Sequence, residues 1–465
     1  MRGRKLKALL MAAALIALAP PAGMLHAATI TPCASTETTA SIGSSKVAQP
    51  KGGGLGSFTI VLAGDTGFNR SDAAVEAEGV RNKGGETLGF SEMTSGIAPD
   101  IDGDLAFANI ETVITDRSDI GADDKGQGSF HFKSHPLGLK ALIDVGFNLF
   151  ALANNHAMDY GAAGVEETLF HMASAAALRA IAYAGIGANF EEATRASCLE
   201  LDGTRIGFAA IGIITGDRPE HRAGKNRPGQ ASYRHRPDFE VVVDRLARLA
   251  ADYRILSIHY GLEGRVVPDA RQLEEWRGLA AGAKGIDLIV GHHPHVAQGV
   301  ELSGTSLIFY GLGNFLHPGT AEMTRFGICR DYGLMAKVHL AKGQNGAFTI
   351  AAVEAIPLTK TNLRPERFAS PQESQTRIQA LNYLDARLGD GKGARGLSFT
   401  PQADGSGLYC AEGAADLGGK VGALCKGWEP PADPPRALLA KIAKSCEDKP
   451  FYGAGKREPS LWDLF

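Results

Sequence analysis

The chain has 465 residues, a formal net charge of −3 and 44% hydrophobic residues. This length and composition indicate a globular protein with one large domain or two ordinary ones. A mildly acidic chain is a poor match for nonspecific binding to nucleic acids, so we expect no nucleic-acid partner.

The N-terminal segment has the features of a secretory signal. Four basic residues, Arg2, Arg4, Lys5 and Lys7, precede the apolar run 8–19 and a stretch of small residues that ends at Ala28. That run is too short for a permanent membrane-spanning helix. We expect residues 1–28 to be cleaved, which removes four positive charges from a net of −3 and leaves −7. The mature protein is then periplasmic or secreted; a protein tethered by an uncleaved leader is the alternative.

The rest of the chain predicts a layered α/β fold. Residues 29–56, rich in Thr, Ser, Ala and Gly, predict a flexible linker. From Ser57 to about Leu358, apolar strand-like runs alternate with helical patterns. We predict helices over 137–145, 164–180, 236–251, 270–283 and 372–388, and a hairpin over 200–212. Residues 395–465 predict an irregular, cysteine-containing extension.

Five apolar segments end in residue types that bind metals. They are 58–63 before Asp65, 105–108 before Glu111, 147–153 before Asn155 and His156, 255–258 before His259, and 288–290 before Gly291-His292-His293-Pro294-His295. Ligands of α/β folds gather at the carboxyl ends of strands, so we expect these side chains to meet. Carboxylate, imidazole and amide donors without cysteine suit Mn²⁺, Fe or Zn²⁺. The sequence therefore predicts a site for one or two divalent ions.

The spacing of the histidines suggests which of them bind metal. His293 and His295 form an H-x-H pair that can aim two ring nitrogens at one ion or at two adjacent ions. Glu111 is the natural bridge because a carboxylate has two oxygens. We expect the His292 ring to point away from His293 and exclude it from the ligand set.

A general acid is also predicted beside these donors. His156 directly follows Asn155, so its ring can face a leaving group, and Asp159 is placed to orient that ring. Each residue alone also has an ordinary structural role: Asp65 as a turn or helix cap, and His259 as a hydrogen-bonded core residue. The joint pattern over five strand ends favours a functional site.

The segment 215–237 carries many basic residues in a loop that contains Gly and Pro. Arg222, Lys225 and Arg227 are predicted to contact an anionic substrate. A solvated connection without a substrate role is the alternative.

The six cysteines are expected to form disulfides, because an exported chain meets an oxidising environment and none of them lies in a C-x-x-C pair. Cys410 and Cys425 are the favoured local pair. The remaining connectivity stays open.

The motifs taken together resemble a known family. They are Gly64-Asp65, Asn109-Ile110-Glu111-Thr112, Asn154-Asn155-His156-Ala157-Met158-Asp159-Tyr160-Gly161, His259-Tyr260-Gly261-x-Glu263, Gly291-His292-His293-Pro294-His295-Val296-x-Gln298 and Tyr310-Gly311-Leu312-Gly313-Asn314-Phe315. In this combination and order, over about residues 57–390, the chain resembles the CapA family. These are capsule and poly-γ-glutamate synthesis proteins with a calcineurin-like metallophosphoesterase fold.

The resemblance implies a four-layer α/β sandwich, two mixed sheets flanked by helices, over residues 57–394, followed by the extension. One ion would be held by Asp65, Glu111 and His295, and the other by Glu111, Asn155, His259 and His293. Asn109 and Asn314 are assigned to substrate binding, with Asn314 at the rim. The wider superfamily usually has Asp-x-His at the first strand end, and Gly67 occupies the histidine position here. The first ion therefore lacks one expected ligand.

We therefore expect an exported metal-dependent hydrolase or transferase. It would act in the synthesis, release or anchoring of an anionic polymer such as poly-γ-glutamate. The substrate would be that polymer or a phosphoester, and membrane-bound polymer-synthesis proteins are possible partners. The alternative is a non-catalytic envelope factor that uses the same cleft to hold polymer during export.

Overall fold

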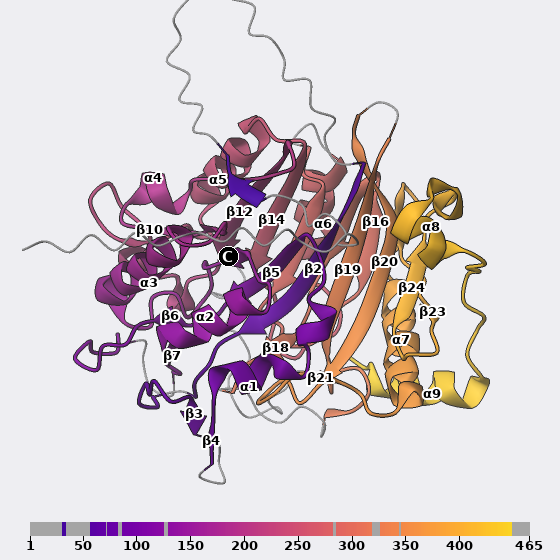
Figure 1. The fold of residues 1–465 in the computed structure, drawn as a ribbon, viewed down its shortest axis with the longest axis horizontal. Helices are drawn as coiled ribbons and strands as arrows, with labels where there is room; N and C mark the ends of the chain where they lie inside the picture. The colour runs from indigo at the N-terminus through magenta and orange to yellow at the C-terminus, as the bar shows by residue number, and fades with distance from the viewer. Residues whose placement is uncertain are drawn as a thin grey trace, which may run out of the picture.

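The computed structural model describes residues 30–33, 56–70, 72–81, 86–124, 129–281, 285–318, 326–343 and 346–448 (Figure 1). The predicted signal peptide and most of the predicted linker lie outside these residues. Within the described ranges, no helix combines the length and the apolar character that crossing a bilayer requires.

Two large mixed sheets form the centre of the structure. The first has the order β1 (Ile30–Pro32), β11 (Ser197–Leu201), β12 (Thr204–Gly212), β14 (Tyr253–His259), β15 (Leu288–His292), β17 (Ser306–Phe309), β16 (Val300–Ser303), β22 (Ala394–Gly396). The second has the order β23 (Thr400–Pro401), β24 (Gly407–Cys410), β20 (Phe348–Thr359), β19 (Gly333–Lys342), β2 (Ser57–Thr66), β5 (Leu105–Ile110), β8 (Leu149–Ala151), β9 (Ala182–Ala184). Beside it, β18 (Asn314–Leu316) pairs with β2, and β21 (Glu366–Arg367) pairs with β20. The predicted α/β class is confirmed.

Helices and small ribbons surround these sheets. The helices are α1 (Phe90–Ser95), α2 (Pro136–Asp144), α3 (Gly161–Ala176), α4 (Phe190–Ala193), α5 (Arg236–Arg248), α6 (Ala270–Ala281), α7 (Pro371–Asp385), α8 (Gly419–Cys425) and α9 (Arg436–Ser445). The ribbons are β3 (Val80–Arg81) with β4 (Thr87–Leu88), β6 (Val113–Ile114) with β7 (Lys133–Ser134), and β10 (Ile186–Gly187) with β13 (Gly229–Gln230). Each predicted helix is present, and so is the hairpin, which turns at Asp202 and Gly203 with φ of 45° and 80°.

Alternation along the strands creates separate cores on the two faces of each sheet. In β2, Ile60 and Leu62 join a cluster that also contains Phe208 of the other sheet, whereas Val61 between them joins a cluster that contains Leu142 of α2. This is the period-two pattern of a strand that is buried on both faces.

The first sheet is buried in the same way. Phe208 and Ala210 of β12 lie in the cluster shared with the second sheet, while Ile211 packs with Val242 of α5 and Trp276 of α6. Both sheets are therefore held rigidly, and their strand ends provide fixed positions for functional side chains.

The two ends of the described chain differ from prediction. Ile30–Pro32, inside the predicted linker, pairs antiparallel with β11, and Cys33 forms a disulfide with Cys198. The predicted extension is built into both sheets, because β22 pairs with β16 and β24 pairs with β20 (Figure 1). The expected Cys410–Cys425 disulfide is confirmed, and Cys329 pairs with Cys446. Backbone hydrogen bonding over distant pairings, which sequence periodicity does not encode, explains both differences.

Candidate metal centre

The buried carboxylate of Glu111 lies at the centre of the site. Glu111 directly follows β5, and its backbone N–H donates to Thr66 O of β2 over 2.8 Å. Its side chain is 0% exposed, and within the described residues neither carboxylate oxygen accepts a hydrogen bond. Buried carboxylates are normally paired or bound to metal, so this environment calls for a cation.

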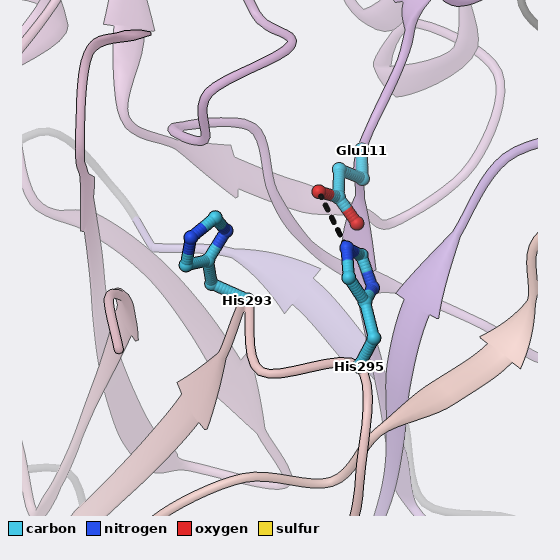
Figure 2. A group of neighbouring side chains, drawn as sticks. All are labelled: Glu111, His293 and His295. Carbon is cyan, nitrogen blue, oxygen red and sulfur yellow. Dashed lines mark ion pairs between the residues drawn. The ribbon is translucent and has the colours of Figure 1, made fainter. Parts of the chain in front are cut away.

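Two histidines of the second half of the chain face this carboxylate. Ligand atoms of Glu111, His293 and His295 all lie within 4.8 Å of one another. Figure 2 shows the imidazoles arriving on one turn and the carboxylate on a separate strand end. The structure thus brings together segments that lie far apart in the sequence, as expected.

Further imidazoles surround both Glu111 oxygens. Oε1 lies 3.4 Å from His259 Nε2, 3.8 Å from His295 Nε2 and 3.9 Å from His156 Nε2. Oε2 lies 3.5 Å from His317 Nε2. Two donors on one ion, at about 2.1 Å each and at angles of 90–109°, are separated by about 3.0–3.4 Å. The observed separations are close to that spacing, so the donor set fits divalent ions of the Mn, Fe or Zn type.

Asp65 provides a second buried carboxylate beside the first. Its Oδ2 lies 3.3 Å from His295 Nδ1, and its Oδ1 lies 3.3 Å from His292 Nδ1. Burial favours the protonated form of Asp65, but His292, His295 and His259 outweigh burial and hold the pKa of Asp65 well below its ordinary value. Gly64 lets the backbone of Gly313 lie directly against β2, because a Cβ at position 64 would meet Gly313 O at 1.9 Å.

His292 was left out of the ligand set, and its contacts lie behind the predicted ligands. The ring is fully buried, its Nδ1 lies 3.3 Å from Asp65 Oδ1, and it stacks on His259 with ring centroids 6.4 Å apart. The cause is the parallel register of β14 and β15, in which His259 and His292 are direct partners and their side chains therefore lie on the same face.

The turn that carries His293 and His295 has an unusual backbone. Their φ values are 94° and 57°, in the left-handed region that side chains other than glycine rarely adopt. The His293 N–H is also held near Asp65 Oδ2, at 3.3 Å. Strain of this kind persists where surrounding structure fixes it, and it concentrates at functional sites.

Electrostatics divide the histidines into two groups. Burial lowers the pKa of His259 well below its ordinary value and lowers the pKa of His293 to about 4 and of His317 to about 3. At neutral pH these rings are therefore neutral, the form that binds metal. Burial also acts to lower the pKa of His295, but the carboxylates of Glu111 and Asp65 outweigh it and raise that pKa to about 10.

His156 and Asp159 are in contact, as expected for an oriented imidazole. His156 Nδ1 lies 2.8 Å from Asp159 Oδ2, which also accepts the Phe132 N–H over 2.5 Å. The opposite nitrogen, Nε2, is directed toward Glu111. This geometry leaves Nε2 facing the metal centre, and the role of general acid remains a prediction.

The asparagines are located differently from what we expected. Asn109 is fully buried; its Nδ2 donates to Asp65 Oδ1 over 2.8 Å and lies 3.1 Å from His259 Nδ1. Asn314 is 1% exposed, and its Oδ1 lies 2.9 Å from His295 Nδ1. Both therefore contact predicted ligands and orient them. Asn314 was expected at the rim and is buried instead, and the substrate role of the two asparagines stays a prediction. Asn155 Oδ1 lies 2.7 Å from His259 Nε2, so these two predicted ligands are neighbours.

The basic loop makes internal contacts. Arg222 forms a two-pronged ion pair with Asp238, and the Arg227 guanidinium donates to the carbonyls of Pro219 and Arg222. Lys225 is exposed. None of the described contacts of these three residues reaches the metal centre, because the loop folds on itself and on α5.

Two charged residues near the site were not assigned roles from the sequence. The pKa of His293, lowered mainly by burial, is raised by Glu263 and lowered by Arg234. Glu263 belongs to the His259-Tyr260-Gly261-x-Glu263 motif, and Arg234 belongs to the basic loop. Both could therefore have been recognised from the sequence as candidate site residues. His317 had a weaker signal, because it follows a strand of only three residues.

Comparison with known proteins identifies the family. The model described as "Bacterial capsule synthesis protein PGA_cap" matches residues 59–318, more than half of the chain. The chain belongs to this family. The PGA_cap match contains every predicted metal ligand, and the resemblance to CapA proteins is confirmed.

Three relatives show the range of the similarity. The "PGA biosynthesis protein CapA" of Bacillus subtilis is 30% identical over 54% of this chain and 61% of its own length. The "Capsule biosynthesis protein CapA" of Bacillus anthracis is 32% identical over 41% of this chain and 45% of its own length. A "Probable polyglutamine synthesis accessory protein" of Mycobacterium tuberculosis is 29% identical over 66% of this chain and 77% of its own length. The match thus covers less than two thirds of either Bacillus relative.

Proposed function

We propose that this protein is a metal-dependent hydrolase or transferase that acts in the biosynthesis, release or anchoring of capsule or poly-γ-glutamate. The observation that carries the proposal is Glu111, a buried carboxylate that accepts no hydrogen bond among the described residues and has imidazole nitrogens beside both oxygens. The names of the PGA_cap relatives support the polymer class. We include membrane-bound polymer-synthesis proteins in this proposal as partners.

We further propose that the fold is the four-layer metallophosphoesterase-like sandwich. The support is the arrangement of three cores: one shared by the two sheets, one between the second sheet and α2, and one between the first sheet and α5 and α6. Such layering places the carboxyl ends of parallel strands from both sheets at one site.

The chain's own residues would orient substrate and move a proton. One or two divalent ions, when bound, would supply Lewis acidity toward an anionic group and activate a water molecule. His156, held by Asp159, would protonate the leaving group through Nε2. Arg234, which lies close enough to lower the pKa of His293, would attract the anionic substrate.

We also propose that the protein is exported and works in the periplasm or outside the cell. Three disulfides, Cys33–Cys198, Cys329–Cys446 and Cys410–Cys425, support an oxidising compartment. The basic N-terminal segment followed by an apolar run is consistent with this. Detection of the mature N-terminus in a periplasmic or culture fraction tests it.

The non-catalytic alternative relies on the basic loop as a polymer-binding surface. Asp238 neutralises Arg222, whereas Arg227 donates to carbonyls of its own loop and stays exposed, as Lys225 does. The loop therefore offers less free positive charge than its sequence suggests. Polymer binding that survives removal of metal, and is lost with Lys225→Ala, would favour this alternative.

The decisive experiment compares metal content and hydrolysis in wild type and His293→Ala. We expect wild type to hold divalent metal and to hydrolyse a model phosphodiester or poly-γ-glutamate, and the variant to lose both. His339→Ala is the matched control: this histidine is also fully buried but contacts Thr59 and Glu354 instead of the site. Equal metal content and equal activity in His293→Ala would refute the enzymatic function.

A further inference from the structure

We infer that His317 is a ligand of the first ion and takes the place that Gly67 leaves vacant on β2. The inference rests on the proposed metal centre and assigns to it a residue outside the expected ligand set. It predicts a complete first site, with Asp65, Glu111, His295 and His317 as donors.

The strand pairing puts His317 at the correct position. The short strand β18 runs parallel to β2, with Asn314 opposite Asp65 and Leu316 opposite Thr66. The Gly67 N–H then donates to Leu316 O over 2.7 Å, so His317 begins directly beside Gly67. A neighbouring strand thus supplies an imidazole where β2 itself has no side chain.

The distances fit shared coordination. His317 Nε2 lies 3.5 Å from Glu111 Oε2, close to the separation of about 3.4 Å expected for two donors on one tetrahedral ion. The rings of His317 and His295 have centroids 5.7 Å apart at 72°, so they approach the same region from different directions. His295 lies 3.8 Å from Glu111 through Nε2 and 3.3 Å from Asp65 through Nδ1, so it lies between the two carboxylates.

The ring of His317 is prepared for this role. It is 1% exposed, its backbone N–H donates to Thr361 O over 2.7 Å, and Phe132 packs edge-on with centroids 5.0 Å apart. A rigid imidazole aimed at a carboxylate needs little reorganisation to bind a cation.

The test measures Mn²⁺ binding by calorimetry, with stoichiometry from elemental analysis of the purified protein. His317→Leu and His317→Ala should weaken the binding of one Mn²⁺ by at least ~100-fold, the upper end of what loss of an outer-shell partner costs. The Leu variant preserves more of the side-chain volume, so a failure of the Ala variant to fold does not decide the result. His339→Ala should bind Mn²⁺ as wild type does.

A rescue experiment tests the shared position directly. A Cβ on Gly67 would meet only ordinary contacts, the nearest at 3.6 Å to Thr112 Cβ, so Gly67→His has room to begin its side chain. Combined with His317→Leu, it should recover Mn²⁺ affinity to within about tenfold of wild type, as expected when a donor returns to the same ion.

The outcomes separate this inference from the proposed function. Wild-type affinity and stoichiometry in both His317 variants, with loss of metal in His293→Ala, would overturn the role of His317 alone. A wild-type protein that binds no Mn²⁺ would overturn both. Loss of one ion in the His317 variants with recovery in the double variant supports the assignment.

Discussion

Metal binding should release a proton and strengthen as the pH rises, because His295 carries a proton that coordination must displace. Burial lowers the pKa of His295, but Glu111 and Asp65 outweigh burial and raise it to about 10. A pH of about 7.5 lies ~2.5 units below this pKa, so His295 is protonated before metal binds. Displacing this proton weakens the apparent affinity by ~300-fold, or roughly 3 kcal/mol. His293 has a pKa of about 4 and is already neutral at this pH, so its coordination releases no proton.

Calorimetric titration with Mn²⁺ checks this in buffers of different ionisation enthalpy, at several pH values between about 6.5 and 8.5. At least one proton should be released per His295-bound ion, because burial and then Asp65 also raise the pKa of Glu111 well above its ordinary value. The dissociation constant should therefore fall at least about tenfold per pH unit. In His295→Gln the release should decrease and the pH dependence should flatten. A wild-type enthalpy that does not depend on buffer, with affinity constant across this range, would refute the reasoning.

Two other substitutions separate catalysis from stability. His156→Asn should lower kcat by ~10²–10⁴-fold with metal content unchanged; loss of metal, seen by elemental analysis, would instead make His156 a ligand. Arg222→Ala leaves the buried Asp238 without its two-pronged partner and should lower the free energy of unfolding by about 2 kcal/mol, less than a fully buried pair costs because Arg222 is 27% exposed. Because the pair lowers the pKa of Asp238, its contribution is present at neutral pH and is lost as the pH falls through that pKa. Urea denaturation checks this, with exposed Arg248→Ala expected to be neutral.

The strand ends were the most predictable part of the structure. The runs before Asp65, Glu111 and His259 are apolar, flanked by glycine or turn residues, and buried on both faces, so composition alone marks them as internal strands. Ligands of α/β folds collect at the carboxyl ends of strands, so the donors could be predicted to meet without knowledge of the sheet order.

The features that were missed depend on register and on distant pairing. His292 is in the site because it is the direct partner of His259 in neighbouring strands, and a shift of one residue would turn it away. His317 follows a three-residue strand whose partner, β2, lies about 250 residues earlier in the chain. Asn109 and Asn314 were assigned to substrate because their motifs were visible, whereas their burial was not. Local patterns report which face of a strand is apolar, and they carry no information on which strands become neighbours.

The Cys33–Cys198 disulfide has a consequence for how the donors are assembled. It joins residues 165 positions apart and so closes a covalent loop of the chain. This loop includes β2, β5 and β8, and with them Asp65, Glu111 and Asn155. The later donors, His259 among them, lie outside the loop. Closing a loop of this size lowers the conformational entropy of the unfolded chain by about 5 kcal/mol in free-energy terms at 25 °C. Three of the six predicted ligands thus lie within one disulfide-closed loop. In a reduced chain this loop is open, so bringing the same ligands together on folding costs more conformational entropy.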